Sequence, residues 1–155
     1  MTSPLQLEQM VYERIEIVAV PGHEPGANVN VKTSVCLGST EDLKDWRVRL
    51  NVTVSPDETP KPPYAINIVA SGAFKPATLE ESPERIAKLV GVTGSSILYS
   101  AMREMVLLLT GRCQYGPFML PTQSFVHLDF RKAQQPQAKA TAGKKAAKRR
   151  KRADG

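Results

Sequence analysis

Few side chains in this sequence are spaced so that they could carry out chemistry together. The two histidines, His23 and His127, lie in a Pro/Gly-rich loop and in a late apolar segment, and neither has a partner at metal-ligand spacing. Glu24 follows His23, but a solvated loop explains that pair better than a metal site does. No glycine pattern for phosphate binding is present. The sequence therefore predicts a protein that is not an enzyme and that uses neither a metal nor a cofactor.

The cysteines and the hydropathy indicate a cytoplasmic protein. Cys36 and Cys113 form no redox or metal-binding motif and suit a reducing compartment. Arg112, which precedes Cys113, could lower the pKa of that thiol, but a catalytic cysteine is a poor expectation. No apolar run is long enough to be a transmembrane segment, and the first twenty residues lack the basic start of a secretory signal.

Charge divides the chain into a body and a tail. The whole chain carries a net charge of +6, but residues 131–155 alone carry ten Lys or Arg and one acid. Residues 1–130 then hold 11 basic and 14 acidic side chains, so the body is mildly acidic. We expect two parts, a folded domain over 1–130 and a disordered basic tail over 131–155, because the tail has too few apolar residues to bury.

The tail contains a dense basic run without aromatic residues. Such a run attracts phosphates without reading sequence, and the attraction weakens with salt. Nucleic acid, the ribosome, an anionic membrane and acidic protein faces are all candidate partners, and a solvated extension without a partner is equally compatible. The basic residues of this run are Lys144, Lys145, Lys148, Arg149, Arg150, Lys151 and Arg152.

The body begins with segments that alternate apolar and polar residues, the period-two pattern of half-buried strands. The four segments are 5–19, 29–37, 46–54 and 64–74. In the first, the alternation predicts that Val11, Glu13 and Ile15 share one face and that Tyr12 lies on the other. Gly72, near the end of the fourth, predicts a bulge or a close backbone approach.

After residue 80 the apolar period becomes helical. Ser82 followed by Pro83 is a typical N-cap and first turn, and it predicts a short helix that ends near Val90. A second helix is expected over 96–110, with Gly111 as its stop. Four strands followed by two helices give an α+β fold, a four-stranded antiparallel sheet with two helices packed on one face.

The second helix has one apolar misfit. Leu108 and Leu109 belong to its apolar half, but Leu107 falls among the polar residues. We interpret Leu107 as a candidate contact in a homo-oligomer. The loop that follows is crowded with apolar side chains, including Tyr115, Phe118 and Met119, whereas loops are normally polar.

Residues 97–125, ILYSAMREMVLLLTGRCQYGPFMLPTQSF, resemble the SecB-type protein-export chaperones. That family has an N-I-L-F-P-Y-A-R-E-like helix start, an R-G-x-F-P-like loop and an L-x-P-x-N-F segment. Upstream, RVRLNVTV and INIVASGAF resemble two of its strands, and the resemblance covers roughly residues 5–130. Ser100, Ala101 and Cys113 depart from the pattern. The residues in register are Ile97, Leu98, Tyr99, Arg103, Glu104, Arg112, Tyr115, Leu120 and Phe125.

The resemblance implies a cytosolic holdase that binds unfolded or precursor proteins in apolar grooves, assembled as a dimer or a dimer of dimers. Burial of apolar client side chains, worth about 25 cal/mol per Å², makes such binding tolerant of sequence. Methionines and aromatic residues suit a surface of this kind, although each could equally be core. The candidate groove residues are Trp46, Tyr64, Phe74, Tyr99, Met102, Met105, Tyr115, Phe118, Met119 and Leu120.

One departure bears on the export partner. The resemblance implies that export members reach the motor SecA partly through acidic residues on the outer face of the sheet. Here Arg14, Val18 and Asn67 stand at those positions. SecA therefore remains a candidate partner, although the loss of acidic residues at these positions argues against binding to it. A relative dedicated to another client, such as an antitoxin, is the alternative.

Two further function classes stay open on the sequence. A nucleic-acid-binding or ribosome-binding protein would act through the basic tail, although the body shows no reading module. A small-ligand-binding α+β domain is the weaker alternative. Client binding that survives without the tail would favour the chaperone over the nucleic-acid binder.

Overall fold

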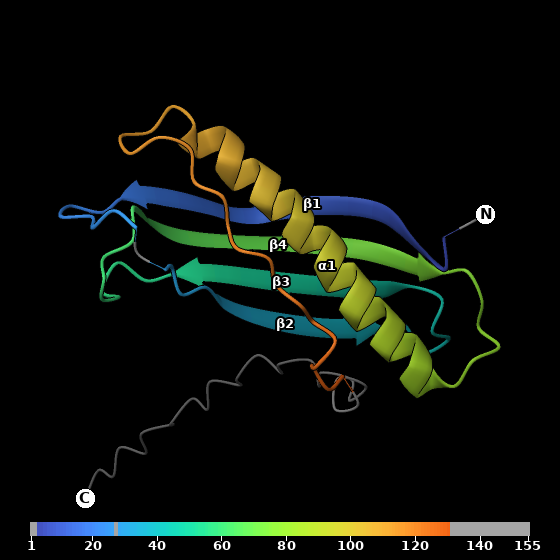
Figure 1. Cartoon of the computed structure of the whole chain (residues 1–155). Helices are drawn as coiled ribbons and strands as arrows, with labels where there is room; N and C mark the ends of the chain where they lie inside the picture. Colours follow the sequence, from blue (N-terminus) through green and yellow to red (C-terminus); the bar gives the residue numbers. More distant parts are fainter. Residues whose placement is uncertain (1–2, 27, 131–155) are drawn as a thin grey trace, which may run out of the picture.

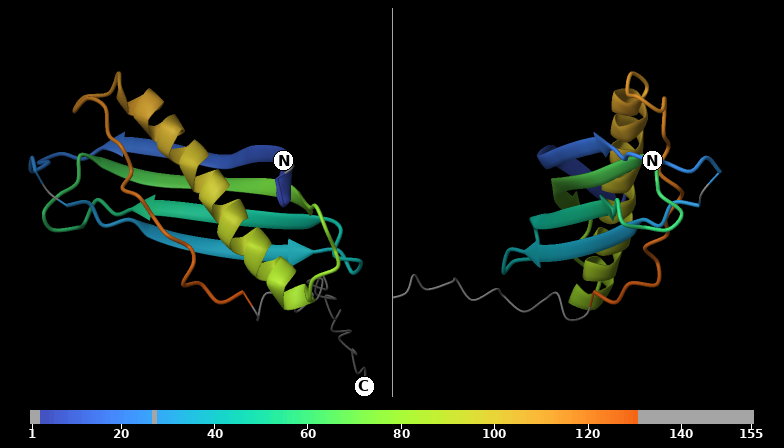
Figure 2. Two further views of the ribbon diagram at one scale, coloured as in Figure 1. Left: turned by 45° about the vertical axis from the view of Figure 1, so that its right-hand side comes forward. Right: turned by 90° about the vertical axis from the view of Figure 1, so that its left-hand side faces the viewer.

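The computed structural model describes residues 3–26 and 28–130, which form a two-layer α+β fold. A single helix crosses one face of an antiparallel sheet diagonally, and residues 111–130 return along the helix over the same face (Figure 1, Figure 2). The elements are β1 (Leu5–Ala19), β2 (Lys32–Ser39), β3 (Trp46–Val54), β4 (Tyr64–Pro76) and α1 (Pro83–Thr110), and the strand order is β1-β4-β3-β2.

The sequence-based expectation of a four-stranded antiparallel sheet is confirmed. The bounds of β1 and β3 are as expected, whereas β2 starts three residues later, at Lys32, and β4 continues to Pro76. Val29 and Val31, expected within the second strand, precede it and still pack against the core.

The core lies between α1 and one face of the sheet. Alternate residues of β3, from Trp46 to Val54, are at most 3% exposed, and the facing residues of β4 include Ile68 and Ala70. Side chains directly opposite on paired strands share a face, so this register places two apolar rows under the helix. The clean alternation in β3 is the sequence signature of this arrangement.

Two irregularities in β1 overturn the expected assignment of its faces. The pairing with β4 shifts between Leu7 and Gln9 and again between Tyr12 and Arg14, so Glu8 and Glu13 stand out of register. Tyr12 lies opposite Ala70 and therefore faces the helix, whereas Val11 lies opposite Ser71 on the outer face. The expectation that Val11, Glu13 and Ile15 share one face is wrong, because each extra residue reverses the alternation after it.

The helix is continuous over 28 residues, so the prediction of two helices is wrong. Ser82 caps its N-terminus as expected, its side chain accepting a hydrogen bond from the Arg85 amide. Gly91 and Gly94, which separated the two predicted helices, lie inside α1. A helical glycine costs about 1 kcal/mol relative to alanine. The close packing around Gly91 and Gly94 explains why this cost is tolerated.

The glycines let neighbouring groups come close to the helix backbone. A Cβ atom at Gly94 would lie 2.9 Å from Val48 Cγ2 and 3.3 Å from the Phe74 ring. At Gly91 it would lie 2.6 Å from the Phe130 ring. Gly72 of β4 has the close approach expected from the sequence, because a Cβ there would lie 2.6 Å from the Phe74 ring.

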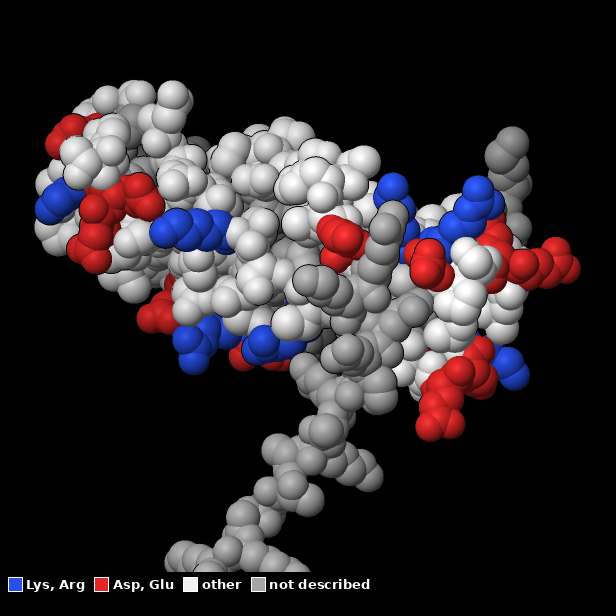
Figure 3. Space-filling view, turned by 90° about the horizontal axis from the view of Figure 1, so that it is seen from below, with Lys and Arg blue, Asp and Glu red and all other residues white. Residues whose placement is uncertain are grey.

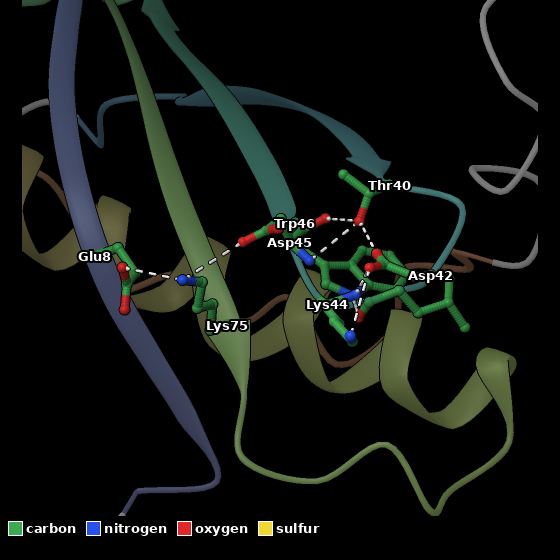
Figure 4. A network of polar contacts seen from close by, with 8 residues as sticks. Glu8, Thr40, Asp42, Lys44, Asp45, Trp46 and Lys75 are labelled. Atoms are coloured by element: carbon green, nitrogen blue, oxygen red, sulfur yellow. Dashed lines mark hydrogen bonds and ion pairs between the residues drawn. The ribbon is translucent and has the colours of Figure 1, made fainter.

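Polar contacts fix the β2–β3 turn and connect it to β4 and to the edge strand β1 (Figure 4). The Thr40 hydroxyl donates to Asp42 at 2.6 Å, and the Trp46 indole N–H donates to the Leu43 carbonyl at 2.8 Å. Lys75 of β4 lies 3.8 Å from Asp45 and also 3.5 Å from Glu8 of β1. These ion pairs link β1 and β4 to the turn that precedes β3.

Within residues 3–26 and 28–130, no helix combines the length and apolarity needed to cross a membrane.

The close approach at Gly94 leads to a stability prediction. Gly94→Val should destabilise the fold by about 1–3 kcal/mol, because the added branch must displace Val48 or the Phe74 ring from a packed core. Gly111→Val is the matched control, since a Cβ at Gly111 meets only ordinary contacts at 3.5 Å. Chemical denaturation would measure both, and equal stability of the two variants would contradict the packing role of Gly94.

Candidate functional site

Most of the candidate groove residues form the core of this chain. Met102 and Leu120 are fully buried, and no other residue of this buried set is more than 3% exposed. They fill the space between α1, the sheet and the returning segment, so they offer no surface to a client in this conformation. This corrects the expectation that they line a groove. The buried candidates are Trp46, Tyr64, Phe74, Tyr99, Met102 and Leu120.

Four candidates reach the surface. Met119 is 54% exposed, and Met105, Tyr115 and Phe118 are partly buried. The Phe118 ring lies 6.3 Å from the Tyr64 ring, centroid to centroid, and packs against the core while its side chain stays partly exposed. A client-binding role for these four residues stays a prediction.

The loop after α1 is held by hydroxyl groups rather than by a regular backbone ladder. The Tyr64 hydroxyl accepts from the Tyr115 amide at 3.0 Å and donates to the Gly116 carbonyl at 2.7 Å. The Tyr115 hydroxyl in turn donates to the Val20 carbonyl at 2.8 Å. Thr110 closes the loop, because its hydroxyl accepts from the Phe118 amide at 2.8 Å.

The segment beyond the loop is anchored along one side of α1. The Tyr99 hydroxyl donates to the Pro121 carbonyl at 2.6 Å, and Arg103 Nε donates to the Leu120 carbonyl at 2.9 Å. Phe125 packs edge-on against the Tyr99 ring, with 5.8 Å between centroids. Burial raises the pKa of Tyr99 to about 12, although the Arg103 charge opposes this shift. Residues 111–130 therefore cover one flank of the helix.

Exposed apolar residues surround the C-terminal end of α1. Leu108 is 74% exposed and Leu109 is 40% exposed, although the sequence pattern placed both on the apolar half of the helix. Leu107, the expected misfit, is only partly exposed. The pattern failed here because the periodicity of a helix does not show how far the helix extends over its sheet. We call the exposed or partly exposed apolar side chains of Met105, Leu108, Leu109, Phe118 and Met119 the apolar rim.

The polar residues considered for chemistry are dispersed. His23 Nδ1 lies 3.1 Å from the Lys61 carbonyl oxygen, and its ring stacks obliquely on Tyr115. Cys36 and Cys113 are both free and exposed. No group of three or more His, Cys, Asp or Glu side chains within residues 3–26 and 28–130 is arranged to hold a metal.

Arg103 and Glu104 are not paired with each other in the described part of the chain. Arg103 binds the Leu120 carbonyl and contacts Met119 Sδ at 3.4 Å. Glu104 lies near Tyr12, and burial of Tyr12, together with this carboxylate, raises the pKa of that phenol. Both residues thus act within the chain, one on the returning segment and one toward β1.

The outer face of the sheet carries the positions compared with SecA-binding acids. Arg14 lies opposite Val69, Asn67 lies opposite Glu16, and Val18 lies opposite Ala65, which places all three away from the helix. The basic tail at 131–155, including Lys144–Arg152, lies outside the described residues.

Comparison with known proteins places this fold. No protein-family model and no curated protein sequence matches the chain. The Rv1957 SecB-like chaperone of Mycobacterium tuberculosis, solved with a ChAD peptide from the HigA1 antitoxin, is similar in structure with a TM-score of 0.60 and 18% sequence identity. The match covers 78% of this chain and 91% of that chain. The fold is that of a SecB-like chaperone.

A second solved structure is more distant. It is a protein of unknown function from Streptococcus agalactiae, with a TM-score of 0.47 and 14% identity, covering 76% of this chain and 97% of that one.

The anchoring of the loop by Tyr64 can be tested directly. Tyr64→Phe removes a hydroxyl that serves both the Tyr115 amide and the Gly116 carbonyl, so unfolding should become easier by about 1–3 kcal/mol. Hydrogen exchange at the Tyr115 amide should accelerate more than exchange within β3. Unchanged exchange at Tyr115 would show that the loop does not depend on this hydroxyl.

Proposed function

We propose that this protein is an ATP-independent chaperone, a holdase that binds unfolded or precursor proteins in the cytoplasm. The observation that carries the proposal is the apolar rim, in which Leu108, Leu109 and Met119 are exposed to solvent. The SecB-like fold supports it. The proposal includes no catalytic step and no cofactor.

The chemistry of the rim suits clients of many sequences. Methionine is flexible and polarisable, so Met105 and Met119 could adapt to different apolar side chains. Phe118, which precedes Met119 in the chain, offers a partly buried ring. Exposed apolar patches of this kind commonly mark interaction surfaces in soluble proteins. Within the rim, we assign Phe118 and Met119 to the client, with Tyr115 beside them.

We assign the other part of the rim to a second copy of the chain. Leu108 lies on the solvent side of α1 with Leu107 nearby, and β1 is an edge strand that also exposes Val11 and Val18. An uncovered edge strand with apolar residues favours association. We therefore propose a homo-oligomer, a dimer or a dimer of dimers.

The comparison favours one client class as an alternative. The similar Mycobacterium tuberculosis chaperone was solved with a peptide from an antitoxin. A chaperone dedicated to an antitoxin is thus a second form of the same proposal. Export through SecA is the less favoured form, because Arg14, Val18 and Asn67 occupy the three outer-face positions at which acidic residues are expected.

A nucleic-acid-binding or ribosome-binding role through the basic tail is the alternative from another class. Figure 3 shows that Lys and Arg alternate with Asp and Glu over one side of the body rather than gathering into one patch. Binding through the tail would fall steeply with salt, whereas apolar client binding would persist.

Met119 allows a direct test of client binding. Because Met119 is 54% exposed, Met119→Ser should change the free energy of unfolding by less than about 0.5 kcal/mol. It should nevertheless weaken suppression of aggregation by a chemically unfolded model client. Leu120→Ser is the matched control, since Leu120 is fully buried and its loss should unfold the protein first, at a cost of about 2–5 kcal/mol. Full holding activity in stable Met119→Ser and Phe118→Ser proteins would locate the client elsewhere.

The oligomer is tested at Leu108. Leu108→Lys should leave the stability of a single chain within about 0.5 kcal/mol, because the side chain is 74% exposed there. Light scattering should show a lower mass, since a buried charge would oppose the interface. Ser100→Lys, on the exposed side of the same helix, is the control. A wild-type monomer at micromolar concentration would contradict the proposed assembly.

A further inference from the structure

Met119 is the most exposed methionine in the part of the chain that the structure describes. The sequence has five methionines, and Met1 lies outside the described residues. Met102 is fully buried, and Met10 and Met105 are partly buried. Met119, by contrast, is 54% exposed. Because an oxidant must reach the thioether sulfur in order to react with it, we expect methionine oxidation to begin at Met119.

The sulfur of Met119 faces a guanidinium group. Arg103 Nη2 lies 3.4 Å from Met119 Sδ, and Arg103 Nε donates to the Leu120 carbonyl at 2.9 Å. The two contacts are made with consecutive residues of the returning segment, so they hold the guanidinium in one orientation. None of the ion pairs among the described residues involves Arg103. The N–H groups of Nη2 are therefore directed at a sulfur atom and not at a carboxylate.

The thioether of Met119 makes poor use of this donor. Its sulfur is only a weak hydrogen-bond acceptor, whereas the oxygen of a sulfoxide carries partial negative charge and accepts strongly from a cation. A methionine side chain has three rotatable bonds, so an oxygen added to Sδ can turn toward Nη2 without movement of the backbone. Arg103 is thus placed to bind the oxidised form of Met119 more strongly than the reduced form.

Oxidation would also change the surface that we assign to the client. Met119 follows Phe118 in the apolar rim and precedes the buried Leu120. A sulfoxide is polar, so its contact with apolar client side chains is less favourable than that of a thioether. The fold should persist, because Met119 is mostly outside the core and Arg103 keeps its hydrogen bond to the Leu120 carbonyl.

We propose, on the basis of the holdase function proposed above, that Met119 is a reversible oxidation site that regulates client binding. The sulfur lone pair attacks one oxygen of hydrogen peroxide, so that an S–O bond forms and the O–O bond breaks. The proton of the transferred oxygen passes to the leaving hydroxide, which departs as water. Sulfur loses two electrons and the peroxide gains them.

The guanidinium of Arg103 then binds the sulfoxide oxygen of Met119. The site returns to its reduced form through a thiol-dependent sulfoxide reductase. In that reaction two thiols become a disulfide, and the sulfoxide oxygen leaves as water.

Peroxide treatment of the full-length protein, followed by trypsin and mass spectrometry, tests the site. Cleavage after Lys and Arg separates three of the methionines. The peptides 89–103, 104–112 and 113–131 carry Met102, Met105 and Met119, respectively. Met119 should be oxidised about tenfold faster than Met105, and Met102 should react last, because its sulfur is reached only when the core opens.

The role of Arg103 is read from its own Nε–H signal in NMR spectra. Oxidation of the wild-type protein should shift this signal, because the guanidinium exchanges a contact with sulfur for one with oxygen. Oxidation should also raise the melting temperature, since a charge-assisted hydrogen bond is stronger than a contact with a thioether. Arg103→Leu should show no such rise. Met119→Leu is the control for the NMR signal, which peroxide should leave unshifted in that variant.

Holding activity is then compared before and after peroxide, with dithiothreitol added to reduce any oxidised Cys36 or Cys113. Oxidised wild-type protein should bind an unfolded model client about three- to tenfold more weakly. Sulfoxide reductases for both epimers should restore binding. Peroxide should not change the activity of Met119→Leu, whatever its starting level. Met105→Leu is the matched control, and it should still respond to peroxide.

Three results would overturn the proposal. Oxidation of Met105 or Met102 ahead of Met119 would remove the site. An unshifted Arg103 signal in the oxidised protein would show that the guanidinium does not bind the sulfoxide. An equal response to peroxide in Met119→Leu and wild-type protein would assign the regulation to another residue. A reduced wild-type protein without holding activity would instead contradict the holdase, and selective oxidation of Met119 with a shifted Arg103 signal would still establish the modification site.

Discussion

The close approach of α1 to the sheet is the constraint on which the rest of this structure depends. Gly94 brings the helix backbone against Val48 and Phe74, and Gly72 leaves room for the same aromatic ring beneath it. A diagonal helix of 28 residues crosses a four-stranded sheet without covering it completely. One flank is then closed by residues 111–130, and the C-terminal end of the helix is left with exposed leucines.

The returning segment determines which aromatic residues are core and which are surface. It is anchored to α1 through Tyr99 and Arg103, and to the sheet through Tyr64. Its own Leu120 and Phe125 fill the seam between helix and sheet. The same segment presents Met119 outward, one residue before the buried Leu120. Core and proposed client surface are therefore made from adjacent residues of one extended chain.

The sequence predicted the strands well because their alternation follows directly from one buried face, as Trp46–Val54 shows. The sequence-based prediction failed where the structure depends on residues from other elements that pack beside the segment. Glu13 shifts the faces of β1, which is visible only once β4 is paired beside it. In the sequence, Gly91 and Gly94 suggest a break between two helices. The structure shows that they lie inside one helix, where Phe130 packs on Gly91 and Val48 packs on Gly94. The groove expectation failed for Tyr64 and Tyr99 because composition cannot distinguish an aromatic residue that lines a surface from one that bonds a loop.

The way in which residues 111–130 are attached has a consequence for the energy landscape of the native state. Their polar anchors are side-chain hydrogen bonds of Tyr64, Tyr99, Arg103 and Thr110, spaced along the segment, whereas β3 and β4 share a continuous ladder. Isolated anchors can release one at a time, while a ladder opens cooperatively. Residues 111–119, which precede the buried Leu120, thus open at a lower free energy than the strands, and a protease that cleaves there samples those opening reactions without waiting for global unfolding.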